Sequence, residues 1–383
     1  MILVINSGSS SLKFKLFDCQ LKPLAGGLVE RIGLRDSFLA WKAGEAGKRT
    51  DWPEGVADHQ QALAGVIREL AAAGLPITEI GAVGHRVVHG GEEFTAPTVV
   101  TAAVEKKLAA YSKLAPLHNP ANLAGIAACR RLFPRVKQVA VFDTAFYRTL
   151  PDYAFMYALP WEYYQKHQIR KYGFHGISHD YVTREAARLM KKPLSRLRLV
   201  SCHLGSGASV TAVKFGRAVE TTMGFTPLEG LTMSTRCGDI DPAIPLYLIR
   251  ELGMTERQVD DVMNRQSGLL GVSGYKDMRD VMCAAGMKVP GYVFKDKVTA
   301  VVRRRAKLAY EMYCYDVARY VASYAGVMGG CDAVIFTAGV GERSPEVRKK
   351  VMSMIKLAGR PRVLVVPTDE EMMIARETDR VAF

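Results

Sequence analysis

The first residues of the chain alternate between apolar and polar positions in a way that predicts two strands joined by a turn. An apolar run over residues 2–5 is followed by a stretch that places Leu12, Phe14 and Leu16 on one face and lysines on the other. The segment between them, NSGSSS, combines a glycine with four serines. Such a turn presents backbone N–H groups and hydroxyls to one place, which suits phosphate. Serine-rich hairpin turns also occur without any ligand, so both interpretations stay open here.

Helical and strand patterns alternate along the rest of the chain. The apolar residues Leu63, Val66, Ile67 and Leu70 recur at helical spacing, and Gly74 ends that pattern. Strands are predicted at about 80–90, 137–142, 198–214 and 332–338, and helices after a Ser178 cap, over about 296–327 and from 344–345. This alternation predicts the α/β class, with a domain boundary near residues 147–160.

One internal repeat links the two halves of the chain. The segment CHLGSGASVTAVKF, residues 202–215, repeats the opening pattern, with His203, Gly205 and Ser206 at the corresponding places. Two such turns predict a duplicated domain that holds a phosphate chain between its copies, as in actin-like ATPases. A P-loop is excluded because G-x-x-x-x-G-K-[ST] is missing. GVGERS, residues 339–344, lacks the last glycine of the dinucleotide-binding G-x-G-x-x-G.

Composition and charge narrow the class of partner. With 383 residues and 49% hydrophobic residues the chain is globular, and no run approaches the roughly 18 apolar residues of a membrane span. The formal charge of +14 is spread along the chain, which favours small anionic substrates over nucleic acid or a membrane surface. Seven scattered cysteines form no C-x-x-C pair, so neither disulfides nor a zinc site are indicated. Because the sequence shows neither a membrane span nor an address signal, a cytoplasmic location is expected.

Five segments place ionisable side chains where strands are expected to end. They are GHRVVHGGE with Arg86, APLHNPAN with His118, VFDTAF with Asp143, YGFHGISH with His175, and GFTPLEGLTMSTRCGDIDP with Arg236. Each residue alone has a structural explanation, such as a surface ion pair, a capping histidine or a turn. Together they supply guanidinium forks for anionic oxygens, a donor for developing charge and a carboxylate for Mg²⁺. This set predicts phosphoryl transfer.

A zinc site is the competing interpretation of the histidines. His85 and His89 are spaced i, i+4, as are His175 and His179. That spacing forms a metal-binding face only on a helix. The segment HRVVH is rich in β-branched residues and flanked by glycine, and HGISH contains glycine, so the pattern disfavours zinc.

Eight segments, in order, resemble the signatures of one enzyme family. They are NSGSSSLK, GHRVVHGG, APLHNP, VFDTAF, YGFHGISH, TTMGFTPLEG, TRCGDIDPAI and FTAGVGE. The chain is therefore similar to the acetate/propionate kinase family of the actin-like superfamily from residue 1 to about 378. The resemblance implies the reaction ATP + acetate ⇌ ADP + acetyl phosphate with Mg²⁺, catalysed by a homodimer. It also implies two duplicated actin-like (ribonuclease H-like) domains with a cleft between them: 1–147 plus 370–383 on the acyl side, and 148–369 on the nucleotide side.

The resemblance also implies a role for each matching residue. Arg86 and Arg236 would bind the acetate carboxylate and the phosphoryl group, His175 would donate to the phosphoryl oxygens, and Asp143 would organise the metal or the nucleophile. Phosphate and Mg²⁺ contacts would come from Asn6, Ser9, Ser11 and Lys13, with Glu370 ordering the metal. His118, His203, Gly205, Ser206 and Gly207 would line the phosphate path. Adenosine would lie against Asp277, Met278 and Arg279 and over a loop containing Gly339, Gly341 and Glu342, beside Arg343.

The acyl pocket is predicted from strand geometry. Residues i and i+2 of a strand share a face, so Val88 is expected beside Arg86, where it would wall off the methyl end of acetate. Leu117, Phe174 and Pro227 are further candidate walls from matching segments. A valine leaves less room than alanine or glycine, which favours acetate over propionate.

Three positions depart from the family pattern. Ser206 and Arg343 each stand where asparagine is usual, and Tyr147 stands where a histidine often follows DTAF. Two alternative functions remain: a propionate kinase, and a non-catalytic actin-like or Hsp70-like module that uses the nucleotide as a switch. The pair Arg86 and Arg236 argues against a switch, which has no need for two guanidinium groups at a small carboxylate.

Overall fold

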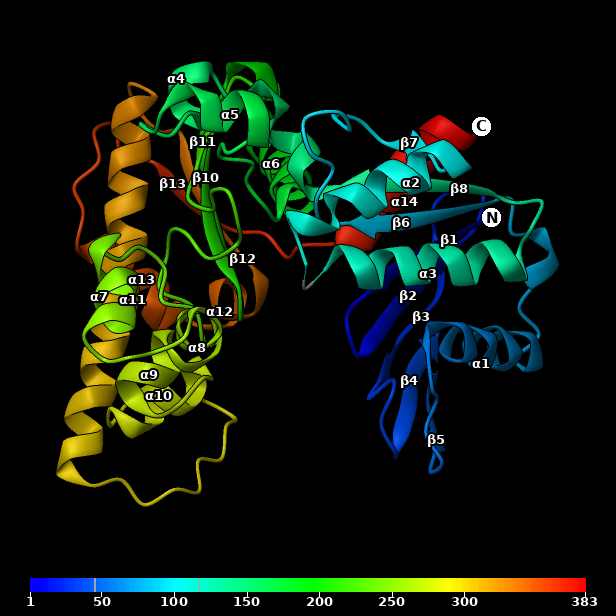
Figure 1. Cartoon of the computed structure of the whole chain (residues 1–383), viewed down its shortest axis with the longest axis horizontal. Coiled ribbons are helices and arrows are strands. Elements are labelled where there is room, and N and C mark those ends of the chain that lie inside the picture. Colours follow the sequence, from blue (N-terminus) through cyan, green and yellow to red (C-terminus); the bar gives the residue numbers. More distant parts are fainter. Residues whose placement is uncertain (45, 117) are drawn as a thin grey trace. The chain divides into compact units, whose positions relative to one another are not determined.

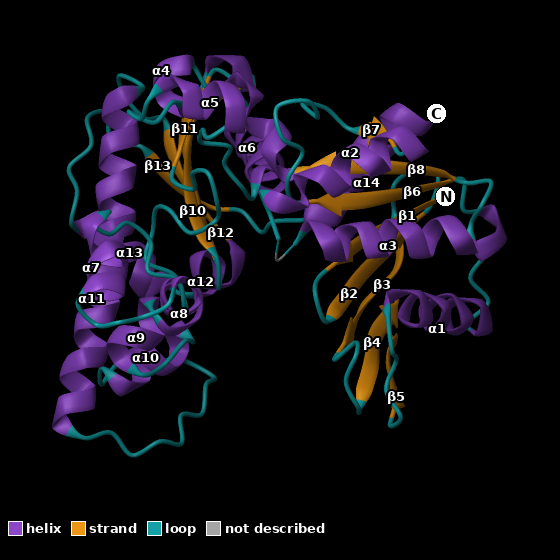
Figure 2. Ribbon diagram, viewed as in Figure 1, coloured by secondary structure: helices purple, strands orange, loops and turns teal. Residues whose placement is uncertain are grey.

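The structure, a computed structural model, describes residues 1–44, 46–116 and 118–383. The chain folds into two compact units (Figure 1). Unit 1 contains residues 1–148, 175–181 and 369–383, and unit 2 contains residues 149–174 and 182–368. Each unit is built on a β-sheet with helices packed against it (Figure 2), which confirms the α/β class. The units differ from the actin-like division predicted from the sequence at residues 148, 175–181 and 369, and that division stays a prediction.

The described residues of unit 1 form an eight-stranded sheet of order β5-β4-β3-β2-β1-β6-β8-β7. Its strands are β1 (Ile2–Ser7), β2 (Ser11–Phe17), β3 (Pro23–Glu30), β4 (Ser37–Ala43), β5 (Ala46–Trp52), β6 (Ala82–Val87), β7 (Thr98–Val99) and β8 (Lys137–Phe142). The first five strands pair antiparallel, whereas β1, β6 and β8 run parallel. The unit also contains α1 (His59–Ala72), α2 (Ala102–Ala110), α3 (Asn119–Leu132), α14 (Glu370–Ala382) and the 3₁₀ turns Ile77–Glu79, Tyr111–Lys113 and Asp143–Thr149.

Both faces of the central strand β1 are buried, because successive side chains of a strand point to opposite faces. Leu3 and Ile5 pack with α1 and α3 on one face, and Ile2 and Val4 pack with α14 on the other. In β2, Leu12, Phe14 and Leu16 are all buried in the first of these cores, as their spacing predicted. The helix α1 likewise confirms the predicted pattern of residues 63–70.

The described residues of unit 2 form a five-stranded sheet of order β11-β10-β9-β12-β13. Its strands are β9 (Arg198–Leu204), β10 (Ala208–Lys214), β11 (Arg217–Thr221), β12 (Ala333–Thr337) and β13 (Arg362–Val365). The helices are α4 (Asp152–Phe155), α5 (Trp161–His167), α6 (Gly176–Met190, which begins in unit 1), α7 (Ala243–Arg250), α8 (Glu256–Asp261), α9 (Gly268–Ser273), α10 (Met278–Ala284), α11 (Ala300–Val327), α12 (Ala338–Arg343) and α13 (Pro345–Ser353). A 3₁₀ turn at Leu194–Arg196 and a π-helical turn at Val262–Gln266 complete it.

Most predicted elements are confirmed, and three predictions are wrong in detail. Ser178 lies inside α6 and does not cap it, because the helix already begins at Gly176. The long helix α11 begins at Ala300 and not near 296, since Thr299 caps it by accepting a hydrogen bond from the N–H of Val302. The segment predicted as a loop over Gly339 and Glu342 is the short helix α12. Within the described residues, no helix is both long and apolar enough to cross a membrane.

Candidate active site

A cluster of charged side chains surrounds Arg86 in unit 1. Its Nη2 donates to Oδ2 of Asp143 over 2.8 Å, and its Nη1 lies 3.3 Å from Oε2 of Glu370. The sheet explains this meeting: β6 and β8 are parallel neighbours, Arg86 is next to last in β6, and Asp143 directly follows β8. The first residue of α14 is Glu370, and α14 packs on both strands. The structure thus brings together three of the predicted residues.

Burial and charge set the ionisation of this cluster. Burial acts to lower the pKa of Arg86, but the charges of Asp143 and Glu370 outweigh it and raise that pKa, so the guanidinium stays charged. Burial raises the pKa of Asp143, and Arg86 opposes this shift. The Asp143 side chain is only 1% exposed, and its Oδ1 has no hydrogen-bond partner among the described residues. A buried carboxylate oxygen without a partner is available to a ligand.

The start of α14 supplies two further carboxylates that the sequence analysis missed. Glu371 lies 2.7 Å from Nζ of Lys13, and Asp369 lies 2.7 Å from Nζ of Lys15. Both lysines are on β2. The run DEE at residues 369–371, with Asp369 capping α14 through the N–H of Met372, was the available signal. The predicted phosphate ligand Lys13 is therefore already paired with a carboxylate in this structure.

The first serine-rich turn is held in place by its neighbours. The N–H of Gly8 donates to the carbonyl of Ser11 over 2.8 Å, which closes the predicted β1–β2 turn. Nε2 of His59 lies 2.7 Å from the carbonyl oxygen of Gly8. Within the turn Ser9 is exposed, and Asn6 and Ser11 are half-buried. The turn is thus ordered and leaves hydroxyls accessible.

The helix α3 joins this turn to the segment after Arg86. The side chain of Asn122 donates to the carbonyl of Ser7 and accepts from the N–H of Val88. Asn119 bonds both the N–H and the carbonyl of His89. The predicted phosphate-path residue His118 occupies the position before α3. The segment HNPAN therefore holds the backbone of Ser7, Val88 and His89 in place, a role that the sequence did not predict.

The predicted reason for placing Val88 beside Arg86 is wrong. The strand β6 ends at Val87, so the alternation of strand faces does not extend to Val88, whose N–H bonds the Asn122 side chain and no strand partner. Val88 is buried all the same. The predicted wall residue Leu117 lies outside the described residues.

His175 directly precedes α6, whose first residues contact Asp143. The N–H of Ile177, in the first turn of α6, hydrogen-bonds the Asp143 carboxylate. Gly176 packs so tightly on the Asp143 carbonyl that a Cβ at this position would overlap it. His175 itself has a left-handed backbone with φ 57°. This local geometry keeps His175 and Asp143 in one compact unit.

A pocket of 810 Å³ lies within unit 2. Nine residues predicted for phosphate, nucleotide or catalysis line it, namely Gly205, Ser206, Gly207, Arg236, Asp277, Met278, Arg279, Gly339 and Arg343. The second predicted turn, between β9 and β10, is one of its walls. Lys276, Tyr292 and Glu346 also line the pocket and were not predicted. Segments that are far apart in the sequence therefore meet at this pocket.

Five residues predicted for unit 2 are not among those that line this pocket: Phe174, His203, Pro227, Gly341 and Glu342. Glu342 instead fixes the backbone around it, since its Oε1 accepts hydrogen bonds from the N–H groups of Ala338 and Thr368. Pro227 contacts the site indirectly, because its carbonyl accepts from Nη1 of Arg236 over 3.3 Å. Phe174 and His203 are buried.

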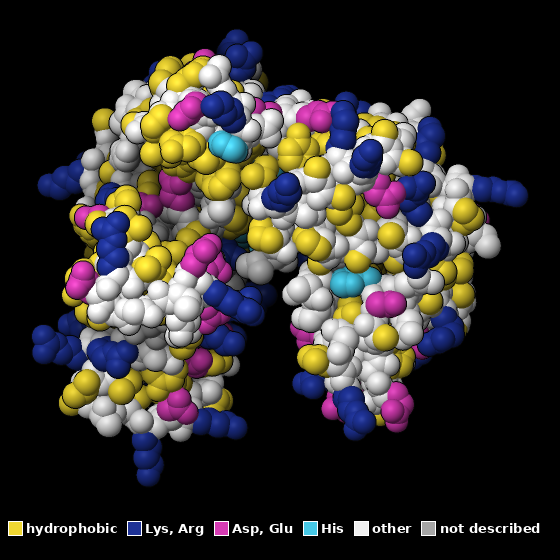
Figure 3. All heavy atoms as spheres, viewed as in Figure 1, with side chains coloured by type: hydrophobic (Ala, Val, Ile, Leu, Met, Phe, Trp, Pro, Cys, Tyr) yellow, Lys and Arg dark blue, Asp and Glu magenta, His cyan; other side chains and the backbone are white. Residues whose placement is uncertain are grey.

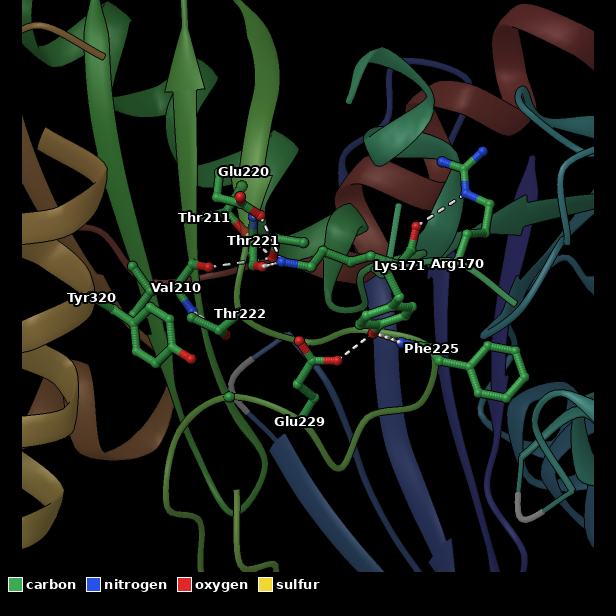
Figure 4. Close-up of polar contacts among 12 residues, drawn as sticks. Arg170, Lys171, Val210, Thr211, Glu220, Thr221, Thr222, Phe225, Glu229 and Tyr320 are labelled. Atoms are coloured by element: carbon green, nitrogen blue, oxygen red, sulfur yellow. Dashed lines mark hydrogen bonds and ion pairs between the residues drawn. The ribbon is translucent and has the colours of Figure 1, made fainter. Parts of the chain in front are cut away.

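A polar network fixes the irregular segment that carries Arg236, residues 224–239, and Figure 4 shows the part of this network around Phe225 and Glu229. Glu229 accepts a hydrogen bond from the Tyr157 hydroxyl, whose oxygen in turn accepts from the N–H of Phe225 over 2.8 Å. Asp239 accepts from the N–H of Gly230 and from the Tyr320 hydroxyl. Burial lowers the pKa of Arg236. No carboxylate of the described residues forms an ion pair with Arg236, so this half-buried cation is suited to an anionic ligand.

A cluster of metal-ligating side chains would indicate a metal site, and a patch of surface charge would indicate a large charged partner. No group of three or more His, Cys, Asp or Glu that could hold a metal ion occurs among the described residues. Asn6, predicted as a metal ligand, pairs with Lys13 in the β1–β2 register. On the face seen in Figure 3, Lys and Arg side chains are scattered over each unit and do not form one patch.

Comparison with known proteins identifies the family. The model of the Acetokinase family matches residues 1–361. Acetate kinases of Methanosarcina acetivorans and Clostridium novyi are 45% and 46% identical, over 99% of this chain and 96% and 98% of theirs. The structure of Porphyromonas gingivalis acetate kinase superposes with a TM-score of 0.89 at 37% identity, covering 100% of this chain and 99% of that one. A propionate kinase from Francisella tularensis also gives 0.89, at 38% identity and 99% of both chains. The resemblance seen in the sequence is thus confirmed, and the chain belongs to the Acetokinase family.

Proposed function

We propose that this chain is an acetate kinase, which transfers the γ-phosphoryl group of ATP to acetate and runs the reverse reaction from acetyl phosphate and ADP. The observation that carries the proposal is the unit 2 pocket, in which nine residues predicted from separate segments meet. The curated relatives of the family support acetate as the acceptor. In unit 1, Arg86 supplies the guanidinium that would bind the acetate carboxylate.

In this proposal the protein binds, orients and neutralises, and it supplies no nucleophile. Arg86 holds the acetate carboxylate, and an acetate oxygen attacks the γ-phosphorus as the bond from phosphorus to the β,γ-bridging oxygen breaks and ADP leaves. Arg236 neutralises the transferred group, because a guanidinium fork matches phosphoryl oxygens. His175 donates to those oxygens as charge develops on them.

The donor set also fits Mg²⁺ that arrives with the nucleotide. Mg²⁺ prefers oxygen ligands and commonly uses one or two protein carboxylates together with substrate phosphates. Asp143 and Glu370 both lie beside Arg86, and Oδ1 of Asp143 is buried without a partner among the described residues. We propose that these two carboxylates hold the ion, with Asn6 nearby on β1. When bound, Mg²⁺ would offset the charge of the phosphates.

The proposal is tested by measuring acyl phosphate formation as the hydroxamate, with acetate, propionate and butyrate as acceptors and ATP, GTP and pyrophosphate as donors. We expect the highest kcat/KM with acetate and a nucleotide, and loss of activity on chelation of Mg²⁺. Binding of ATP without acyl phosphate formation from any of these acids would refute the enzyme and favour the nucleotide-switch alternative.

Propionate kinase is the second candidate, because one of the similar structures is a propionate kinase. Selectivity would depend on the residues at the methyl end, for which Val88, Phe174 and Pro227 stay predictions. An extra methylene in an apolar pocket changes the free energy by about 1–3 kcal/mol. We expect Val88→Ala to raise kcat/KM for propionate relative to acetate, and an unchanged ratio in an active variant would remove Val88 from the pocket.

We further infer a homodimer, supported by apolar side chains that unit 2 leaves exposed. No residue of α7 is buried, and Ile244, Leu246, Tyr247 and Ile249 are all exposed. On α11, the exposed residues Val301, Leu308, Met312 and Tyr315 follow the spacing of one helix face. Exposed apolar faces of this kind are typical of protein interfaces. A second copy of the chain is the partner that we propose.

We also infer a cytoplasmic location. All seven cysteines are free thiols, and Cys129, Cys202, Cys314 and Cys331 are buried. Free cysteines are typical of proteins in a reducing compartment.

A further inference from the structure

The segment between α10 and α11, residues 285–299, borders the unit 2 pocket. It has no helix or strand, yet Val289, Pro290, Gly291 and Tyr292 line the cavity. None of these residues belongs to a segment that carried the family resemblance. Of these four residues, only Tyr292 carries an aromatic ring.

Tyr292 is held in position by two residues of α10. Its hydroxyl donates to Oδ1 of Asp280 over 2.6 Å. The guanidinium carbon of Arg279 lies 4.6 Å from the centre of the ring, within the range of a cation–π contact. Arg279 is in turn fixed by Asp277, to which its Nε and Nη2 donate over 3.0 and 2.6 Å. The ring and the guanidinium are thus oriented before any ligand binds.

This arrangement suits a planar, polarisable ligand. Nucleobases stack on aromatic rings and on arginine guanidinium planes, and they do so with little dependence on base identity. The buried side chains of Met278 and Met282 add apolar surface to the same pocket. At 810 Å³ the cavity is in the size range of small-molecule sites. The glycine turn at Gly205 and the cation of Arg236 also line this pocket and supply polar groups for phosphates.

We propose that Tyr292 is a base-binding residue and that the stacked pair of Tyr292 and Arg279 receives the nucleobase of the phosphoryl donor. The proposal rests on the proposed function, since it concerns the nucleotide of that reaction. It assigns the nucleoside end of the pocket partly to residues 285–299. The ring and its orientation by Asp280 both contribute to binding, and the ring contributes more.

The test compares three variants of the full chain by calorimetric titration with ADP and by steady-state kinetics. Tyr292→Leu removes the ring and Tyr292→Phe removes only the hydroxyl. Phe294→Leu is the matched control, because Phe294 is in the same segment and packs on Tyr275 but does not line the pocket. We expect Tyr292→Leu to raise the Kd for ADP and the KM for ATP about tenfold, as loss of base stacking would. Tyr292→Phe should stay within about threefold and Phe294→Leu within about twofold.

The KM for acetate and kcat should stay within about twofold of wild type in Tyr292→Leu, because a base contact does not touch the acceptor. The proposal is overturned if Tyr292→Leu binds ADP as tightly as Phe294→Leu does, or if Tyr292→Phe is as weak as Tyr292→Leu. If Tyr292→Leu does not fold, Tyr292→Trp decides: nucleotide affinity equal to or above wild type supports stacking, and a tenfold loss overturns it. Wild type that binds no nucleotide and forms no acyl phosphate would refute the proposed function itself.

Discussion

The two arginines of the proposed site differ in their surroundings. Arg86 is surrounded by carboxylates, with Asp143 and Glu370 both in ion-pair range. Arg236 is half-buried, and its hydrogen bonds go to the carbonyl of Pro227 and to the sulfur of Met233. A partly desolvated cation without a counter-ion is less stable than one that an anion binds. At the scale of single residues, Arg236 is therefore the better candidate for the transferred phosphoryl group.

We predict that Arg236→Ala lowers kcat at least about 100-fold, the size of effect seen when an electrostatic donor to a transition state is lost. Arg236→Lys should recover part of it, because an ammonium keeps the charge without the fork. The matched control is Arg265→Ala, since Arg265 forms only an exposed pair with Asp261. The measurement is the hydroxamate assay on variants with wild-type circular dichroism. Near-normal turnover in Arg236→Ala would disprove the role.

A second residue-scale prediction concerns His85, next to Arg86 on β6. Burial lowers its pKa from 6.5 to about 4, and its Nε2 lies 2.8 Å from Oε1 of Gln138. Because the unfolded chain binds a proton that the folded chain does not, the free energy of unfolding falls as pH drops from 6.5 toward 4. At pH 4, this one residue lowers the free energy of unfolding by about 3 kcal/mol.

Urea unfolding of wild type and His85→Gln at pH 7 and at pH 4.5 measures this effect. Glutamine does not titrate and can still bond Gln138, so the variant should lose less stability on acidification than wild type does. His89, whose pKa burial also lowers to about 4, is unchanged in both proteins and cancels in the comparison. Equal losses in the two proteins would contradict the prediction.

At the scale of elements, the packing of α14 on β6 assembles the charged cluster around Arg86 in unit 1. This helix carries Glu370 and Glu371 to Arg86 and Lys13 across a long stretch of sequence. The close approach depends on Gly84, because a Cβ there would overlap the Thr378 hydroxyl and come within 2.8 Å of Cγ2 of Ile374. The glycine thus allows a helix to lie directly on a buried strand.

We predict that Gly84→Ala lowers the free energy of unfolding by about 1–3 kcal/mol through overpacking. It should also lower activity, since α14 must shift with its carboxylates. Thr378→Ala removes the overlapping hydroxyl, so the double variant should be more stable than the sum of the single changes predicts. Denaturant melts of the four proteins give this coupling, and strict additivity would exclude the proposed contact.

At the scale of the whole molecule, the two units are each built on a sheet but expose different surfaces. Unit 1 buries its long sheet on both faces around β1. Unit 2 exposes apolar residues on α7 and on one face of α11. Such faces reduce solubility unless a partner covers them. We therefore propose that the homodimer interface lies on unit 2.

We expect Tyr247→Arg on α7 to convert a dimer into a monomer, because it places a charge in a desolvated interface. Tyr153→Arg is the control, as Tyr153 on α4 is 89% exposed but does not belong to these helix faces. Light scattering after size-exclusion chromatography gives the mass of each protein. A wild-type mass equal to one chain would contradict the proposed dimer. A dimeric Tyr247→Arg variant would show that α7 is not part of the interface.

The sequence alone determined what depends on local pattern. Alternation predicted β1, β2 and their turn, helical spacing predicted α1, and the repeated glycine turn predicted the β9–β10 hairpin. Ordered motifs predicted the family, because each motif carries its own residue types at fixed spacing. These features are encoded within a few residues of one another, so no long-range contact was needed to see them.

Only the tertiary structure decided which distant side chains meet. The pairs of Arg86 with Glu370 and of Lys13 with Glu371 depend on α14 returning to β6 and β2. Tyr292 enters the unit 2 pocket from a segment without regular structure or motif. Val88, which directly follows β6, also makes a long-range contact, since its N–H donates to the side chain of Asn122. Such placements result from packing and hydrogen bonding between segments far apart in the chain, which periodicity and local motifs do not encode.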